Sequence, residues 1–271
     1  MITESSRDTR SKGRRCLNME LIVLGSGTAT PSLERNASGL VVRTSRLLTL
    51  VDIGPGTIRR MCEAGIDTKL VDLILITHFH PDHVSDLVPF LFASNYAFGP
   101  VRSEPFHLVG PQGSEKFYDG LVAVFHDWIV PKGDRLRKKE MSVDGADKFF
   151  MGDVTVRSIP SPHSFPSVSY RLEAEGVSLT VSGDTDDSEG LVELARNTDL
   201  LVCEYSMPDG QKVPGHLVPW EAGRIATRAN ARRLMLTHFY PPCDEVDVAK
   251  QASATFSGQI IIARDLMVLT V

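Results

Sequence analysis

The feature that most constrains this chain is a run of metal-type side chains at residues 77–83, directly after an apolar segment. Three imidazoles and one carboxylate lie within six residues there, and borderline divalent metals such as zinc prefer these groups as ligands. In an extended backbone His78, His80 and Asp82 point the same way, while His83 faces elsewhere. The run therefore predicts that one strand end serves two neighbouring metals. A cluster of surface histidines without a ligand is the alternative.

Composition predicts a globular chain with one domain. The sequence has 271 residues, of which 42% are hydrophobic and 23% charged, and no Gly/Ser/Pro-rich linker divides it. We expect a single domain at residues 19–271 and a disordered, polar and basic leader at residues 1–18. The net charge of −5 argues against a general nucleic-acid binder but leaves a local basic channel open.

Location follows from what the sequence lacks. No apolar stretch approaches the length of a membrane span, so we expect no membrane contact. The leader has no apolar core of the kind that signal peptides carry. The cysteines at positions 16, 62, 203 and 243 are widely spaced and form no Cys-x-x-Cys pair. We interpret them as reduced thiols in a cytoplasmic protein.

The order of short apolar segments and longer amphipathic ones predicts an α/β fold in which two sheets are sandwiched between helices. The predicted strands are residues 20–25, 39–44, 47–53, 71–77, 106–109, 147–151, 153–159, 167–173, 177–182, 199–204, 233–237, 258–262 and 266–270. The predicted helices are residues 55–65, 83–96, 113–127, 187–197, 218–229 and 245–256.

Three further metal-type side chains follow predicted strands. His163 comes after the strand at 153–159, Asp184 after the strand at 177–182, and His238 at the end of the strand at 233–237. Each alone is more typical of a loop residue than of a ligand. Because the carboxyl ends of strands gather loops at one rim, we expect the three to join the cluster at residues 78–83.

Motifs at these positions identify a family. The chain resembles the metallo-β-lactamase fold superfamily and, within it, the ribonuclease Z-like phosphodiesterase branch, over residues 20–271. The resemblance implies a four-layer αβ/βα sandwich of two mixed β-sheets flanked by helices. The motifs are Leu24-Gly25-Ser26-Gly27-Thr28, Asp52-Ile53-Gly54-Pro55-Gly56, the His-x-His-x-Asp-His run that begins at His78, Ser182-Gly183-Asp184-Thr185, Glu204, His216 with Glu221-Ala222-Gly223, and Leu236-Thr237-His238-Phe239.

The resemblance implies a site for two divalent metal ions. His78, His80 and His163 hold the first ion in this scheme. Asp82, His83 and His238 hold the second, and Asp184 bridges both. Imidazole and carboxylate ligands favour zinc, with manganese and iron as alternatives.

The implied reaction is phosphodiester hydrolysis by a hydroxide that bridges the metals. Asp82 also orients the nucleophile. His216 is the implied acid for the leaving oxygen, since an imidazole titrates near neutral pH, and Glu204 orients it. The alternatives are a capping or surface-loop role for His216 and a purely structural role for Glu204.

The sequence differs from the family pattern at segments that bind the substrate in tRNA-trimming members. Between His107 and His163 there is no long Gly- and Pro-rich arm of the kind that tRNA-trimming members carry. The phosphate-binding arginine motif after His238 is replaced by Tyr240-Pro241-Pro242-Cys243. We therefore expect a small or flexible phosphodiester, a nucleic-acid end or a nucleotide-type substrate rather than folded tRNA. Hydrolysis of an ester, lactone, thioester or sulfate ester is the alternative activity, and a non-catalytic metal-binding scaffold is a third reading. The resemblance also implies a homodimer.

The remaining charged and metal-type residues receive ordinary interpretations. A basic run could face phosphate, but the acidic Asp134 and Glu140 beside it favour a solvated surface. His107, His126 and Cys243 are expected to be fold residues rather than ligands. The basic run consists of Lys132, Arg135, Arg137, Lys138 and Lys139.

Overall fold

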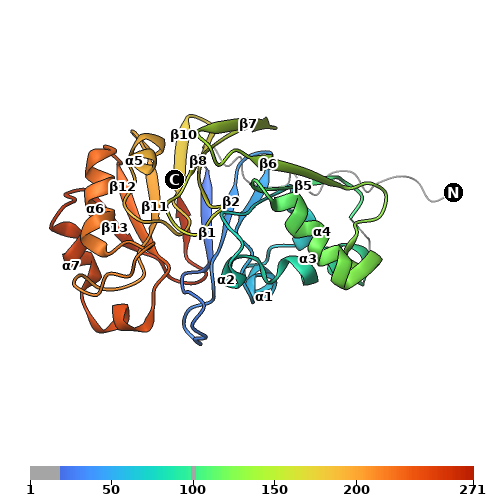
Figure 1. Cartoon of the computed structure of the whole chain (residues 1–271), viewed down its shortest axis with the longest axis horizontal. Coiled ribbons are helices and arrows are strands. Elements are labelled where there is room, and N and C mark those ends of the chain that lie inside the picture. The colour runs from blue at the N-terminus through green and yellow to red at the C-terminus, as the bar shows by residue number, and fades with distance from the viewer. Residues whose placement is uncertain (1–18, 99–101) are drawn as a thin grey trace.

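The computed structural model describes residues 19–98 and 102–271, so the predicted leader at residues 1–18 lies outside the described residues. Two seven-stranded sheets make up the centre of the fold. Helices cover the outer face of each sheet, as Figure 1 shows. The predicted α/β sandwich of two mixed sheets between helices is confirmed.

The first sheet is antiparallel at one side and parallel at the other. Strands from β14 to β3 pair antiparallel, and strands from β3 to β6 pair parallel. In spatial order the strands are β14 (Val268–Thr270), β1 (Glu20–Gly25), β2 (Gly39–Arg43), β3 (Leu48–Val51), β4 (Leu73–Leu75), β5 (Phe106–Pro111) and β6 (Leu136–Met141).

The second sheet repeats this plan. Strands from β13 to β10 pair parallel, and strands from β10 to β7 pair antiparallel. In spatial order the strands are β13 (Gln259–Ile262), β12 (Arg233–Thr237), β11 (Leu200–Glu204), β10 (Val177–Val181), β9 (Val168–Ala174), β8 (Val154–Pro160) and β7 (Asp147–Met151).

The helices divide between the two outer layers. Beside the first sheet lie α1 (Thr57–Glu63), α2 (Pro81–Val84), α3 (Leu87–Tyr96) and α4 (Ser114–Phe125). Beside the second sheet lie α5 (Glu189–Leu194), α6 (Pro219–Arg228) and α7 (Val248–Ser253) (Figure 1). Three short 3₁₀ helices in the described residues are η1 (Thr68–Leu70), η2 (His126–Ile129) and η3 (Pro241–Glu245).

Alternation along the strands builds the core. On β1, Leu21 and Val23 join a buried cluster that includes side chains of both sheets. Ile22 and Leu24 point the other way and join a second cluster with α1, α3 and α4. A period of two along a strand buried on both faces produces this division. Each sheet is therefore held on both faces by apolar packing.

Two sequence predictions about elements are wrong. The segment at residues 83–96 is not one helix, because α2 ends at Val84 and α3 begins at Leu87. The strand β6, which overlaps the basic run, is not among the predicted strands. It forms the edge of the first sheet, where charged side chains are tolerated because one side of the strand faces solvent.

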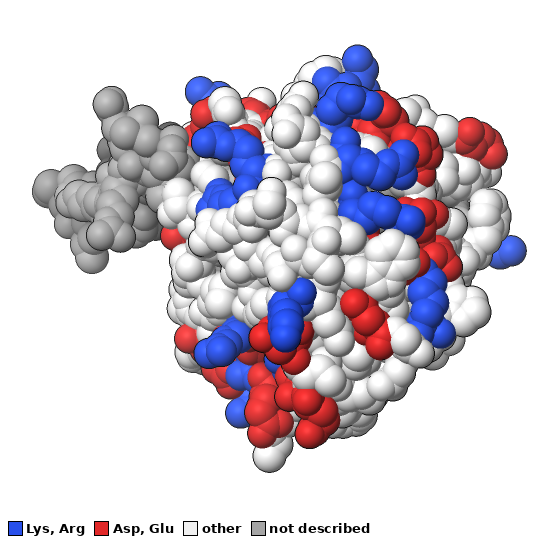
Figure 2. Space-filling view, turned by 90° about the vertical axis from the view of Figure 1, so that its left-hand side faces the viewer, with Lys and Arg blue, Asp and Glu red and all other residues white. Residues whose placement is uncertain are grey.

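The outer surface of the second half carries charges of both signs. Figure 2 shows Lys and Arg side chains next to Asp and Glu side chains across this face. Arg224 pairs with Asp187 at 2.8 Å, and Arg232 pairs with Asp199 at 2.9 Å. Among the described residues, no helix has both the length and the apolar character that a membrane crossing requires.

Candidate metal centre

The ends of four strands deliver the predicted ligands to one rim. His78 follows β4, His163 follows β8, Asp184 follows β10, and His238 follows β12. Hydrogen bonds join the sheets at this rim. Val168 donates its N–H to the Thr77 carbonyl at 2.9 Å, the Tyr170 hydroxyl donates to the Ile76 carbonyl at 2.9 Å, and His238 donates its N–H to the Ser26 carbonyl at 2.9 Å. The rim is therefore a rigid junction of both halves.

The local backbone at the His-rich run differs from the predicted extended form. His80 is the N-cap of α2, and Pro81 occupies the start of that helix, where its fixed φ suits the first turn. Asp82 and His83 consequently lie in the first helical turn. The helix, rather than strand alternation, directs Asp82 toward His83 and His238 instead of toward His78 and His80.

Asp184 lies between two groups of imidazoles. Its Oδ2 atom is 3.8 Å from Nε2 of His78 and 3.7 Å from Nε2 of His163. Its Oδ1 atom is 3.3 Å from Nε2 of His83 and 3.3 Å from Nε2 of His238. Each carboxylate oxygen of Asp184 thus faces a different group.

The other two predicted ligands complete these groups. His80 places its Nδ1 atom 3.2 Å from Nε2 of His163. Asp82 places Oδ2 3.7 Å from Nε2 of His83 and 3.6 Å from Nε2 of His238. Two ligand atoms that each lie about 2.1 Å from one tetrahedral ion are separated by about 3.4 Å. The measured separations are close to this value.

Several buried polar atoms at the centre of the site have no hydrogen-bond partner among the described residues and are suited to bind a metal. Oδ1 of Asp184 and the Nε2 atoms of His78, His83 and His238 are buried and have no hydrogen-bond partner. Buried polar atoms are nearly always paired, so four unpaired atoms that converge indicate a bound group. Nitrogen and carboxylate oxygen donors suit zinc, manganese or iron. The donor set therefore fits divalent metal ions.

Partners at Nδ1 orient four of these imidazoles, as ligand histidines require. Nδ1 of His78 is 3.0 Å from the Thr77 hydroxyl, and Nδ1 of His163 is 2.9 Å from the Gly215 carbonyl. Nδ1 of His238 is 3.5 Å from the Ser206 hydroxyl. In each case the contact leaves Nε2 directed at Asp184.

The fourth partner is Asp52, a buried carboxylate that sequence reasoning did not assign to the site. It lies 2.7 Å from Nδ1 of His83 and accepts hydrogen bonds from the Thr77 amide at 2.8 Å and the Thr77 hydroxyl at 2.9 Å. A signal was present, since Asp52 follows a buried strand and precedes the glycine turn at residues 54–56. Asp52 fixes the ring of His83 and supports the loop that carries His78.

Burial and charge set the ionisation of the site. Burial, together with the charge of His83, lowers the pKa of His78 to about 2, which keeps its Nε2 lone pair free. Burial alone would raise the pKa of Asp82, but the neighbouring imidazoles of His238 and His83 lower it to about 2. The surrounding histidines hold the pKa of Asp184 well below its usual range, although burial opposes this. Both carboxylates are therefore ionised.

His216 and Glu204, the predicted acid and its orienting carboxylate, lie next to each other beside the two groups. Nδ1 of His216 lies 3.0 Å from Oε1 of Glu204 and 3.9 Å from Oδ2 of Asp184. Glu204 is buried at the end of β11, and the Thr185 amide also donates to it at 3.0 Å. Burial lowers the pKa of His216, but the hydrogen bond and charge of Glu204 outweigh it and raise the pKa above the ordinary value.

A lysine bridge that sequence reasoning missed secures the loop that carries His216. Lys212 Nζ lies 2.6 Å from Oδ1 of Asp186 and 2.5 Å from Oε2 of Glu221. Asp186 in turn accepts the Gly215 N–H at 3.0 Å, and Glu221 accepts the Val218 N–H at 3.1 Å. No motif marks Lys212 or Asp186, so this bridge becomes visible only in the structure.

Part of the basic run has a structural role. Arg135 is buried, contrary to its prediction as a solvated residue, and donates to Oδ1 of Asn95 at 3.0 Å and to the Arg102 carbonyl. Arg137 pairs with Asp134 at 2.7 Å, and Lys138 lies 3.4 Å from Asp119. The groups of metal-type side chains found in the described residues do not include His107, His126 or Cys243.

The model of the beta-lactamase superfamily domain matches residues 49–239, which is most of the chain. The chain therefore belongs to the beta-lactamase superfamily, with the metallo-β-lactamase fold. A metallo-β-lactamase fold protein from Bacillus subtilis aligns with a TM-score of 0.79 and 22% identity, over 93% of this chain and 99% of that one.

Curated relatives place the chain more closely. Ribonuclease Z of Thermobifida fusca is 30% identical, over 92% of this chain and 93% of its own length. Ribonuclease Z of Mycobacterium bovis is 29% identical, over 92% of this chain and 96% of its own length. The short form of human tRNase Z aligns with a TM-score of 0.75 and 25% identity, over 93% of this chain and 98% of that one. Within the superfamily the chain belongs to the ribonuclease Z-like branch and is a hydrolase of ester bonds.

Proposed function

We propose that this chain is a two-metal phosphodiesterase that hydrolyses small or flexible phosphodiesters, including nucleotides. The observation that carries the proposal is the position of Asp184, which directs one carboxylate oxygen to each of two imidazole groups. A carboxylate in this position keeps two cations close and offsets their repulsion. Curated relatives named ribonuclease Z support phosphodiester chemistry at such a site.

We assign His78, His80 and His163 to one metal, and Asp82, His83 and His238 to the other. Asp184 is shared, and zinc is the metal we propose. When bound, two divalent ions activate water and neutralise charge on the phosphoryl oxygens. Since Asp82 remains ionised, its carboxylate can accept a hydrogen bond from the attacking water and orient it.

His216 is the proposed acid for the leaving oxygen. Nδ1 of its imidazole faces the Glu204 carboxylate, so the proton available for donation is the one on Nε2. The raised pKa of His216 keeps that proton present near neutral pH. Glu204 fixes the ring through its hydrogen bond and stabilises the imidazolium, which makes Glu204 a positioning residue.

We propose a small or flexible substrate rather than folded tRNA. The residues between His107 and His163 make up most of β5, then α4, η2, β6, β7 and β8, together with their links. Every strand in this segment pairs within one of the two sheets, which supports the absence of a separate tRNA-binding arm. We also propose that residues 19–271 form one domain and that the protein is cytoplasmic, since Cys62, Cys203 and Cys243 are all free.

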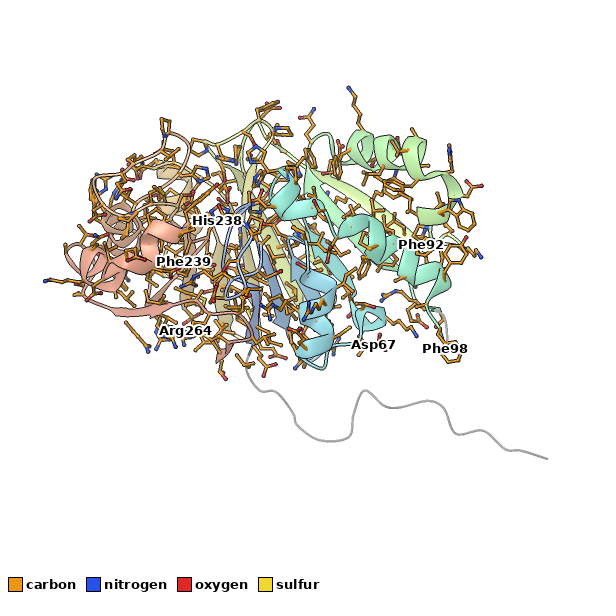
Figure 3. The ribbon with its side chains drawn as sticks, turned by 90° about the horizontal axis from the view of Figure 1, so that it is seen from below. Asp67, Phe92, Phe98, His238, Phe239 and Arg264 are labelled. Atoms are coloured by element: carbon orange, nitrogen blue, oxygen red, sulfur yellow. The ribbon has the colours of Figure 1, made fainter. Side chains whose placement is uncertain are left out.

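The proposed homodimer has a candidate interface on α3 and η2. Phe92 and Tyr96 lie with ring centres 4.8 Å apart, and the Trp128 ring is 5.5 Å from that of Tyr96. All three side chains are exposed. Figure 3 shows Phe92 at the outer end of the first half, away from His238, so a second copy there would leave the metal centre open. Sedimentation equilibrium of wild type and Trp128→Ala tests this face.

The proposed activity is tested with purified, zinc-loaded protein and a set of substrates. We expect turnover of bis-p-nitrophenyl phosphate and loss of that turnover in His80→Ala and Asp184→Ala. A lactone, a thioester and a sulfate ester serve as the comparison set. Turnover of a member of that set without any diester turnover would contradict the phosphodiesterase assignment. If both variants retained every activity, the metal centre would have no catalytic role.

A further inference from the structure

A groove of about 600 Å³ lies between α4 and the loop at residues 163–167. Its walls are largely apolar and include Phe79, Phe117, Leu121, Phe165 and Pro166. Lys116 adds a positive charge at the exposed side. A volume of this size is typical of small-molecule sites.

Two residues that line the groove are close in the chain to proposed ligands of the first metal group. Phe79 lies between His78 and His80 in the chain, so its Cα is about 3.8 Å from the Cα of each. Phe165 is two residues after His163, on the opposite wall of the groove. A ligand in the groove would therefore lie close to the backbone that carries His78 and His80.

The aromatic walls are preformed. Phe79 and Phe117 stack with ring centres 4.8 Å apart and an angle of 16° between their planes. Glycine keeps the space between the walls open, since a Cβ at Gly113 would lie 3.8 Å from Cε2 of Phe79 and 3.9 Å from Cγ of Pro166. At Gly120 a Cβ would meet no atom within 4 Å. The groove is therefore an open slot with flat apolar surfaces.

Phe165 is the unusual member of this wall. Its side chain is 83% exposed, although it borders an apolar groove beside a polar centre. A planar aromatic ligand could cover the Phe165 ring and remove that apolar surface from water. Lys116 supplies the charge that a phosphate oxygen prefers, so the groove suits a flat ring that carries a phosphate group.

We propose that this groove is the binding site for a nucleobase of the substrate, which stacks against Phe165. The proposal rests on the proposed phosphodiesterase function and names its substrate class as a nucleotide diester. Stacking on an aromatic side chain tolerates every base, so the groove would select for the presence of a base and not for its identity.

The test compares a ribodinucleotide, ApA, with the same sugar–phosphate diester without bases. We expect wild type to have a lower KM for ApA than for the base-free diester. The ratio of the KM for the base-free diester to the KM for ApA should therefore be above one. Phe165→Ala should reduce this KM ratio by between about 5-fold and about 150-fold, the range that base stacking implies, and Phe165→Trp should retain it. Phe150→Ala is the matched control, because Phe150 is 71% exposed on β7 and lies outside the groove. A wild-type ratio of one, or a ratio unchanged by Phe165→Ala, would overturn the proposal.

A second variant tests the groove from its other wall. Gly120→Leu places a side chain in open space and improves helix propensity on α4, so folding is preserved while the slot is filled. We expect it to reduce the same KM ratio. If Gly120→Leu bound and cleaved ApA as wild type does, the base would lie elsewhere.

Direct binding separates this proposal from the proposed activity. Calorimetry should show tighter binding of AMP than of ribose 5-phosphate to wild type, with the difference lost in Phe165→Ala. That result without any diester turnover would support the groove and reject the phosphodiesterase assignment. Diester turnover with equal binding of both ligands would support the assignment and reject the groove.

Discussion

Asp52 acts on the metal centre through a neighbour and not through a ligand bond. Its carboxylate is 2.7 Å from Nδ1 of His83, whose Nε2 faces Asp184. We expect Asp52→Asn to weaken zinc affinity by about 10-fold to about 100-fold, as the loss of such partners does. Competition with a fluorescent chelator measures the affinity. Asp72→Asn, a half-buried carboxylate that accepts the Leu48 amide, is the control, and equal affinities in both variants would reject the role of Asp52.

His216 should matter for turnover more than for metal content. If it donates the proton, His216→Asn should reduce kcat by about 100-fold to about 10,000-fold on a diester with a poor leaving group. Elemental analysis should find the wild-type metal content in the variant. A variant with normal kcat would exclude His216 as the acid, and a variant that loses metal would make it a ligand.

The pH profile reports on the same pair. A general acid must be protonated, and Glu204 raises the pKa of His216 above the ordinary 6.5. We therefore expect kcat to stay high below that raised pKa and to fall as the pH rises through it. Glu204→Gln removes the charge, so the fall in kcat should move to lower pH. If kcat fell at the same pH in Glu204→Gln as in wild type, a group other than His216 would be responsible for the fall.

The proposed ligands could be predicted from residue type and spacing. His78, His80, Asp82 and His83 lie within one short run, and the remaining three follow predicted strands. The sequence did not predict the roles of Asp52, Asp186 and Lys212, because these roles depend on contacts between segments far apart in the chain. The burial of Arg135 was also not predicted. Its charge suggested an exposed side chain, but backbone carbonyls from other segments accept hydrogen bonds from its guanidinium in the interior.

At the scale of elements, the loop at residues 206–218 links α6 to the metal centre. Lys212 holds it to Asp186 and Glu221, and the Gly215 carbonyl holds His163. We expect Lys212→Met to lower kcat by up to about 100-fold, because small displacements of a catalytic group have effects of this size. Steady-state kinetics measures the loss.

The control for this loop is Lys250→Met, an exposed lysine on α7 that should keep wild-type kcat. Lys212→Arg retains a cation and should recover part of the loss. If Lys212→Met had wild-type kcat, the bridge would be dispensable and the loop would be held by its backbone contacts alone.

Elements with clear apolar patterns could be predicted from the sequence. A short helix that starts at a proline and a charged strand at the edge of a sheet could not. The parallel strands β11 and β12 are largely buried and contain continuous apolar runs in the sequence. The α2 helix has only four residues, and Pro81 sets its start, so no periodicity marked it. Strand β6 is mostly charged and depends on pairing with β5.

In the whole molecule, both sheets contribute to the candidate metal centre. The proposed ligands after β4 and in α2 belong to the first half, and those after β8, β10 and β12 belong to the second. The sequence predicted two sheets between helices, but not the strand order that brings them together at one rim. That order depends on long-range pairing, such as β1 with β14, which places the last strand beside the first.

We propose that two metals shared by Asp184 make this chain a phosphodiesterase. The most direct test is a zinc titration of metal-free protein while hydrolysis of bis-p-nitrophenyl phosphate is followed. Two groups of ligands around one carboxylate predict that the rate rises until two equivalents are bound and then stays constant. Saturation at one equivalent, or no hydrolysis at any zinc concentration, would contradict the account.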